Sequence, residues 1–261
     1  MCCSASKVRC LPRATARRPN DKVMSMSKKQ SRIDLRIDVL DLEDQHAVVL
    51  TNLKPPELVE AIVAEFHGDV NAQYLGANAA DYYLVNAENS AILDSETPVG
   101  QQVANNGRLA LQEIERPLPS GGRSLKHIAY LRELASGNVY KLRWQPAIVG
   151  RFSEDLPMNE LVAVDLQSYP TGLRVSRRHV AITETDGQFF VENLSKNPVS
   201  IRRGDDVIIS VESRKQQIAP GDVIDLERSD IMLKLIVRNG APPDPVDAPA
   251  AEEPDENEEE N

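Results

Sequence analysis

Apolar and charged residues alternate between Ile33 and Val39, which is typical of a half-buried β-strand. The apolar positions are Ile33, Leu35, Ile37 and Val39. A second strand is predicted at Ala47–Leu50, after a polar turn near Glu43–Asp44. We therefore expect a β-hairpin at this point.

A helix is predicted after the hairpin, because Leu58, Ile62 and Phe66 recur at helical spacing. Pro55–Pro56 suits its first turn and His67–Gly68 its end. Three further strands are expected, and the last follows an Asn-Asn-Gly turn at residues 105–107. These strands are Tyr82–Val85, a short one at Ile92–Leu93, and Leu109–Leu111.

The second half of the chain shows many short apolar runs separated by turn residues, which favours a β-sandwich. Val139, Leu142, Trp144, Ile148 and Val149 begin it. Later strands are predicted at residues 161–164, 180–182, 189–191, 207–209 and 231–237, with turns at 186–187, 203–205 and 220–222.

The segment between these halves, 115–138, is rich in Pro and Gly and contains the apolar run Ile128–Leu131, so we expect a linker with one short ordered piece. Residues 1–31 show no hydrophobic period, and 239–261 are rich in Pro, Asp and Glu, so both ends are predicted to be disordered. The net charge of −10 hides an asymmetry. Residues 1–36 carry about +8 and 239–261 carry −9.

The basic head is interpreted as a dispensable or mis-assigned leader, since Met24 and Met26 are alternative starts; a transit peptide is the lesser reading. The three cysteines, at positions 2, 3 and 10, all lie in this head, which suits a reducing compartment. No run of 18–20 apolar residues is present. We therefore expect a cytoplasmic protein without a membrane span.

The richest polar stretch runs from residue 171 to 199 and combines a hydroxyl, two guanidiniums and an imidazole in Ser176–His179. An Asp-Gly turn at 186–187 predicts a tight hairpin after it. Because the two strands of a hairpin return to the same sheet end, Asn193–Asn197 should lie beside Ser176. This composition predicts an anion site.

Three pieces in order, Gly150-Arg151, Ser176-x-x-His179 and Asn193-Leu194-Ser195-x-Asn197, resemble the forkhead-associated (FHA) domain. The resemblance covers roughly Tyr140 to Arg238 and implies a β-sandwich that binds phosphothreonine peptides. One departure is Asn197-Pro198-Val199, where the family usually has Asn-Gly-Thr. Proline removes a backbone donor, so the ligand-facing loop is expected to be reshaped.

The resemblance also implies roles for individual residues. Arg151 would contact the phosphate, Ser176 would donate its hydroxyl, and Asn197 would hold the ligand's backbone. Arg177 and Lys196 stand at adjoining phosphate-facing positions. The residues implied to support the site are Gly150, His179 and Asn193.

Residues 32–114 resemble the ubiquitin-like β-grasp fold, through their element order and through Leu93-Asp94 before a Thr97-Pro98-Val99 turn. Asn106-Gly107-x-Leu109-x-Leu111 is the other matching element. No Gly-Gly end follows the last strand, so the implied role is docking rather than conjugation.

Other classes of function lack their motifs. Ser176 and His179 have no nucleophile elbow, the histidines have no ligand spacing, and no phosphate-loop sequence is present. Aromatic residues make up 4% of the chain, which leaves few stacking platforms for nucleic acid. We expect no enzyme, no cofactor, no metal site and no specific nucleic-acid partner.

Together these patterns predict a mainly β protein: an FHA-type β-sandwich preceded by a small α+β ubiquitin-like β-grasp domain, with a disordered basic head and acidic tail. The predicted boundaries are 1–31, 32–114, 115–138, 139–238 and 239–261. The expected function is a non-catalytic signalling adaptor that binds phosphothreonine-containing products of a Ser/Thr protein kinase. The alternative is an FHA-like interaction module that does not require phosphate.

Overall fold

The computed structural model describes residues 31–153, 156, 159–204, 206–212 and 214–238. The predicted disordered head and tail therefore lie outside the described residues, apart from Ser31. Within them the protein is mainly β. The first group of elements is β1 (Arg32–Val39), β2 (Leu42–Leu50), α1 (Pro55–Phe66), β3 (Tyr82–Asn86), the short α2 (Val99–Gln102) and β4 (Gly107–Glu113).

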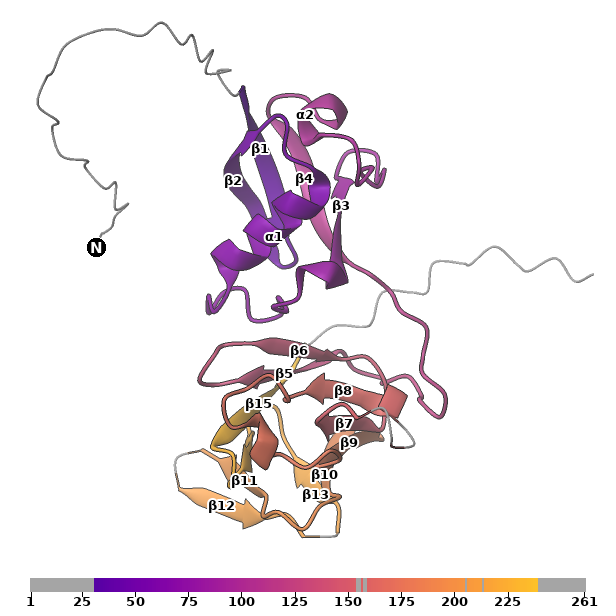
Figure 1. Ribbon diagram of the computed structural model, residues 1–261, viewed down its shortest axis with the longest axis vertical. Coiled ribbons are helices and arrows are strands. Elements are labelled where there is room, and N and C mark those ends of the chain that lie inside the picture. The colour runs from indigo at the N-terminus through magenta and orange to yellow at the C-terminus, as the bar shows by residue number, and fades with distance from the viewer. Residues whose placement is uncertain (1–30, 154–155, 157–158, 205, 213, 239–261) are drawn as a thin grey trace, which may run out of the picture. The chain divides into compact units, whose positions relative to one another are not determined.

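These strands form one sheet in the order β2-β1-β4-β3, in which β1 and β4 run parallel and the other neighbours run antiparallel. Figure 1 shows α1 lying across one face of this sheet. The core between them includes Leu35, Ile37, Leu58, Ile62 and Leu109, all buried. The predicted order of hairpin, helix and later strands is confirmed. The likeness to ubiquitin stays a prediction.

The helix α1 begins and ends where the sequence indicates. Pro55 occupies its first turn, where a missing backbone N–H costs nothing, and the backbone N–H of Lys54 donates to the Glu57 carboxylate at 2.8 Å. Gly68 has a positive φ of 77°, the left-handed conformation that follows a helix end. The apolar stripe of α1 is buried; it consists of Leu58, Val59, Ile62 and Val63.

Two local predictions in this half were wrong. The hairpin turns at Leu40–Asp41, where Leu40 has a φ of 52°, and Glu43–Asp44 lie inside β2 instead. The register of β1 against β2 shifts between Ile37 and Val39, where the backbone N–H of Asp44 donates to the Asp38 carboxylate at 2.8 Å. Ile92 forms a single bridge to Val85 rather than a strand.

The second group of elements is all β apart from short helical turns. Its strands are β5 (Ala129–Glu133), β6 (Val139–Leu142), β7 (Ala147–Gly150), β8 (Val162–Asp165), β9 (Val180–Thr185), β10 (Gln188–Asn193), β11 (Ser200–Arg203), β12 (Val207–Ser210), β13 (Gln216–Ile218), β14 (Val223–Leu226) and β15 (Ile231–Val237).

These strands form two sheets, β13-β10-β9-β7-β8 and β12-β11-β14-β15-β5-β6. One apolar cluster joins side chains of both sheets; Val149, Ile182 and Val191 come from the first, and Ile224 and Leu235 from the second. All five are fully buried. The predicted β-sandwich is confirmed.

The segment predicted as a linker contributes to this sandwich. Strand β5 begins within its apolar run and pairs with β15 on one side and β6 on the other. The sandwich therefore begins before residue 139. The sequence did not reveal this, because a five-residue buried strand shows no alternation and is flanked by turn residues. The strands β11, β13 and β14 were also not predicted.

The predicted turns are confirmed by their backbone angles. Asp186 and Gly187 have φ values of 50° and 78° between β9 and β10, as a tight hairpin requires. Gly204 and Gly221 also have positive φ, before β12 and before β14. In the part of the chain that the structure describes, no helix is both long and apolar enough to cross a membrane.

Substitution of Ile62 by Asp tests the packing of α1. Ile62 is 6% exposed, so an unpaired carboxylate there should cost several kcal/mol, against a usual total stability of about 5–15 kcal/mol. Hydrogen exchange on the full chain should show loss of protection in β1 to β4, with β7 to β15 unchanged. Ala64→Asp, on the exposed face of the same helix, is the control and should retain protection. Equal protection in both variants would contradict the packing.

Candidate functional site

Gly150, at the end of β7, lies unusually close to the loop that precedes β9. A Cβ atom at this position would be 2.3 Å from the carbonyl oxygen of Arg177. No side chain fits at that distance, so this position requires glycine. The backbone N–H of Arg151 donates to the same carbonyl at 3.3 Å, and that of His179 donates to Val149 at 3.0 Å. The end of β7 and the 175–179 loop are thus held together.

Arg151 is half-buried and anchored at one point. Its Nε donates to the carbonyl of Val175 at 2.7 Å. No hydrogen bond joins its terminal nitrogens to any of the described residues. The guanidinium therefore has a fixed direction and two remaining donor groups, which is the arrangement that binds two oxygens of one anion.

The second loop, Leu194–Val199, is closed by Asn193 at the end of β10. The Asn193 side chain donates to the carbonyls of Asn197 at 2.9 Å and Val211 at 3.3 Å. Its oxygen accepts from the backbone N–H of Ser195 at 2.9 Å. Asn193 thus shapes this loop from within.

A side-chain hydrogen bond connects the two loops. Asn197 Nδ2 donates to Ser176 Oγ at 3.0 Å and to the carbonyl of Arg174 at 3.2 Å. The loops meet because Val180 pairs with Asn193 in the β9–β10 hairpin, which returns both ends to one edge of the sheet. The predicted proximity of these loops is confirmed.

Arg177 and Lys196 are exposed on these two loops. Arg178 lies between predicted site residues but braces the loop: it donates to the carbonyl of Arg177 at 3.0 Å and to Asn159 Oδ1 at 3.3 Å. Burial lowers the pKa of Arg178, with a further contribution from the charge of Arg177. The site therefore concentrates positive charge around Ser176.

The His179 side chain is fully buried beneath this site. Its ring nitrogens have no hydrogen-bond partner among the described residues. Burial alone lowers the pKa of His179 to about 4, so the ring is neutral at pH 7. The backbone of His179 connects the two loops to β7. Its carbonyl accepts from the backbone N–H of Leu194, and its N–H donates to the carbonyl of Val149.

Pro198 is exposed, and the residues before and after it are both held in place. The carbonyl of Asn197 before it accepts from Asn193 at 2.9 Å, and Val199 after it is 1% exposed in the core. The departure from Asn-Gly-Thr is thus accommodated without releasing the loop.

A family model provides the decisive comparison. The model of the FHA domain matches residues 148–227, which run from β7 to just past β14 and include both loops. The chain contains an FHA domain.

Solved structures with FHA domains are among those similar to the chain. The FHA domain of human APLF, in complex with an XRCC1 bisphospho peptide, is 19% identical with a TM-score of 0.32; the match covers 42% of this chain and 97% of that one. EmbR of Mycobacterium tuberculosis, in complex with a low-affinity phosphopeptide, is 23% identical with a TM-score of 0.32. That match covers 44% of this chain and 26% of the EmbR chain. No curated protein matches the chain.

Arg228 is a residue of the site that the sequence did not reveal. It lies between β14 and β15 and donates from Nη1 to Asn197 Oδ1 at 3.0 Å. The pairing of Ser200 with Asp225 brings this turn of the FHA domain beside Asn197. In the sequence, Arg228 is marked only as a cation in a turn after a strand. That strand, β14, was not predicted.

The neutral state of His179 is testable by NMR. Among the four histidines of the chain, the His179 ring should stay neutral down to about pH 5, and its signal is identified by its absence in His179→Gln. The unfolded chain protonates this ring near pH 6.5, so its contribution to stability is present above pH 6.5 and lost as pH falls toward 4. Protonation near pH 6.5 in the folded protein would contradict the burial.

Proposed function

We propose that the FHA domain binds a phosphothreonine-containing segment of another protein at Arg151, Ser176, Arg177, Lys196 and Asn197. The observation that carries this proposal is the 3.0 Å hydrogen bond between Asn197 and Ser176, which joins the two loops beside the anchored Arg151. The FHA family match over residues 148–227 supports it.

The proposed roles follow from the free donors. A phosphate monoester brings nearly two negative charges and three strong acceptor oxygens. Arg151 keeps its terminal nitrogens for two of these oxygens, because Nε is taken by Val175. Ser176 Oγ accepts from Asn197 and so retains its own proton for a third oxygen. Arg177 and Lys196 add charge at the rim.

Asn197 is suited to hold the ligand's backbone. Both hydrogens of its amide are used, toward Ser176 and the carbonyl of Arg174. Its oxygen accepts from Arg228 and has a second lone pair, which can accept a backbone N–H of the ligand. Arg228 fixes which end of the amide faces outward, because the opposite orientation would set an NH₂ group against a guanidinium.

The cellular role follows from this binding activity. The protein acts as a non-catalytic adaptor in the cytoplasm, its partner is the product of a Ser/Thr protein kinase, and the ubiquitin-like unit is a second docking module. A second candidate function is an interaction module that does not require phosphate. Pro198 favours it, since it removes a backbone donor from the ligand-facing loop.

Substitutions in the site should separate these functions. On the full chain, Arg151→Ala and Ser176→Ala should each weaken phosphothreonine-peptide binding about ten- to a hundredfold, since a hydrogen bond to a charged group contributes about 1.5–3 kcal/mol. Calorimetry with a peptide selected from a phosphothreonine library, and with its unphosphorylated twin, measures this.

Arg174→Ala is the control, because its side chain is exposed and lies outside the matching positions. Phosphoserine in place of phosphothreonine should also bind more weakly, by about 0.8 kcal/mol or more, because the resemblance implies an apolar pocket for the methyl group. Equal, modest losses for Arg151→Ala and Arg174→Ala would indicate diffuse electrostatics. Equal binding of both twins would establish the function without phosphate.

Arg228 offers a separate test of how Asn197 is held. Arg228→Gln keeps a donor for Asn197 Oδ1, so it should bind phosphopeptide within about threefold of the native chain, whereas Arg228→Ala should lose about tenfold. Calorimetry at low and high salt distinguishes the lost hydrogen bond from lost charge, because only the charge contribution is screened. Equal losses that vanish at high salt would show that Arg228 acts through charge alone.

A further inference from the structure

A groove between β2 and α1 lies outside the candidate site of the FHA domain. Its volume is about 650 Å³. Apolar side chains from both elements line it, among them Ala47, Val49, Leu58, Ala61, Ile62 and Phe66. Ala61 is exposed, Ala47 and Phe66 are half-buried, and the groove is therefore open to solvent.

One wall of the groove is the edge of a sheet. In the sheet order β2-β1-β4-β3, β2 has a neighbour on one side only among the described residues. β2 spans nine residues, and its pairing with β1 is regular from Gln45 to Leu50. The free side of such a strand presents backbone donors and acceptors to which another strand can pair.

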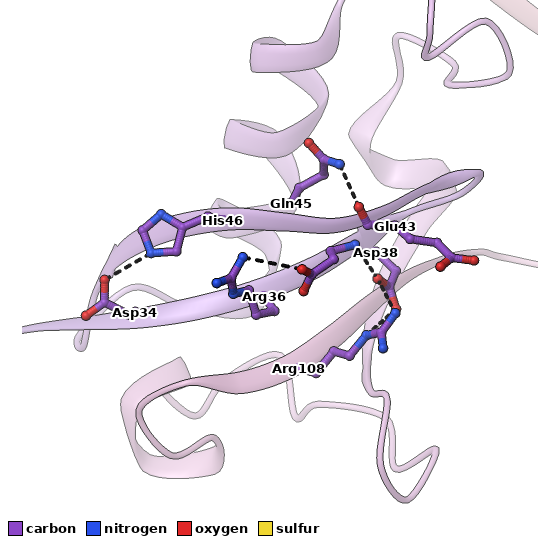
Figure 2. A network of polar contacts seen from close by, with 8 residues as sticks. Asp34, Arg36, Asp38, Glu43, Gln45, His46 and Arg108 are labelled. Carbon is purple, nitrogen blue, oxygen red and sulfur yellow. Dashed lines mark hydrogen bonds and ion pairs between the residues drawn. The ribbon is translucent and has the colours of Figure 1, made fainter.

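On the face of this sheet opposite α1, polar and charged side chains contact one another. Figure 2 shows ion pairs and hydrogen bonds running across β1, β2 and β4. These contacts are the hydrogen bond His46–Asp34 at 3.2 Å and the ion pairs Arg36–Asp44 at 3.4 Å and Arg108–Asp38 at 2.8 Å. The apolar contact surface thus lies at the β2 edge rather than on this face.

The charge around the groove selects the kind of partner. Glu65 and Asp69 lie at its lining, which contains no Lys or Arg. Neither carboxylate forms an ion pair with a described residue, although Asp69 accepts a hydrogen bond from the backbone of Asn71 at 2.8 Å. A ligand with basic residues would therefore be attracted to this end of the groove.

We propose that this groove binds an extended segment of a partner protein, which adds to β2 as a strand. Alternate apolar side chains of the segment enter the groove, and flanking Lys or Arg side chains lie near Glu65 and Asp69. The chain's own basic head matches in charge but lacks a hydrophobic period of two, which favours a partner segment.

A defined peptide tests the proposal on the full chain. The probe is a labelled Lys-Lys-Val-Thr-Ile-Thr-Val-Lys-Lys peptide, measured by fluorescence anisotropy. Ala61→Arg fills the groove and should weaken binding at least tenfold. Ala64→Arg is the matched control, because Ala64 is exposed on the same helix but does not line the groove; it should bind within twofold of the native chain.

Further variants separate charge from strand addition. Glu65→Gln should reduce affinity about two- to fivefold, whereas Glu60→Gln, elsewhere on α1, should have no effect. N-methylation of the peptide amides that face β2 should abolish binding, and methylation of the outward amides should not. A peptide with Glu in place of Lys should bind at least tenfold more weakly.

Several outcomes would overturn the proposal. These are no binding of the lysine-flanked peptide, equal losses for Ala61→Arg and Ala64→Arg, or equal binding of the glutamate-flanked peptide. A gain of tenfold or more on removal of residues 1–30 would make the head of the chain the occupant, which also overturns a partner segment.

Discussion

The close approach of Gly150 to the carbonyl of Arg177 is the constraint on which the candidate site depends. With 2.3 Å between that oxygen and any Cβ at position 150, only glycine lets β7 and the 175–179 loop meet. Arg151 follows directly, so its backbone reaches Arg177 and its Nε reaches Val175. The direction of the Arg151 guanidinium is therefore set by a residue that has no side chain.

The other half of the site is fixed by side-chain amides. Asn193 closes one loop from within, and Asn197 connects that loop to Ser176. An amide can donate and accept at once, so these two residues satisfy backbone groups without using the terminal nitrogens of Arg151. Binding would then require little rearrangement, because the donors are positioned before a ligand arrives.

Local spacing was enough to predict much of this arrangement. The Asp186–Gly187 turn fixes the β9–β10 hairpin, and a hairpin places residues 176–179 beside 193–197 whatever the rest of the sheet does. The role of Arg228 could not be predicted from the sequence, because its contact with Asn197 depends on the pairing of β11 with β14. These are two short strands without alternation. The roles of the site residues toward a ligand remain predictions from the family resemblance.

Burial of His179 has a consequence for how binding responds to acidity. A ring that is neutral at pH 7 contributes no charge to the site, so the positive charge of the site comes from Arg and Lys side chains. Ionisation of His179 therefore does not change the charge of the site near neutral pH. A phosphate monoester loses its second proton near pH 6, so recognition would follow the ionisation of the ligand rather than that of the protein.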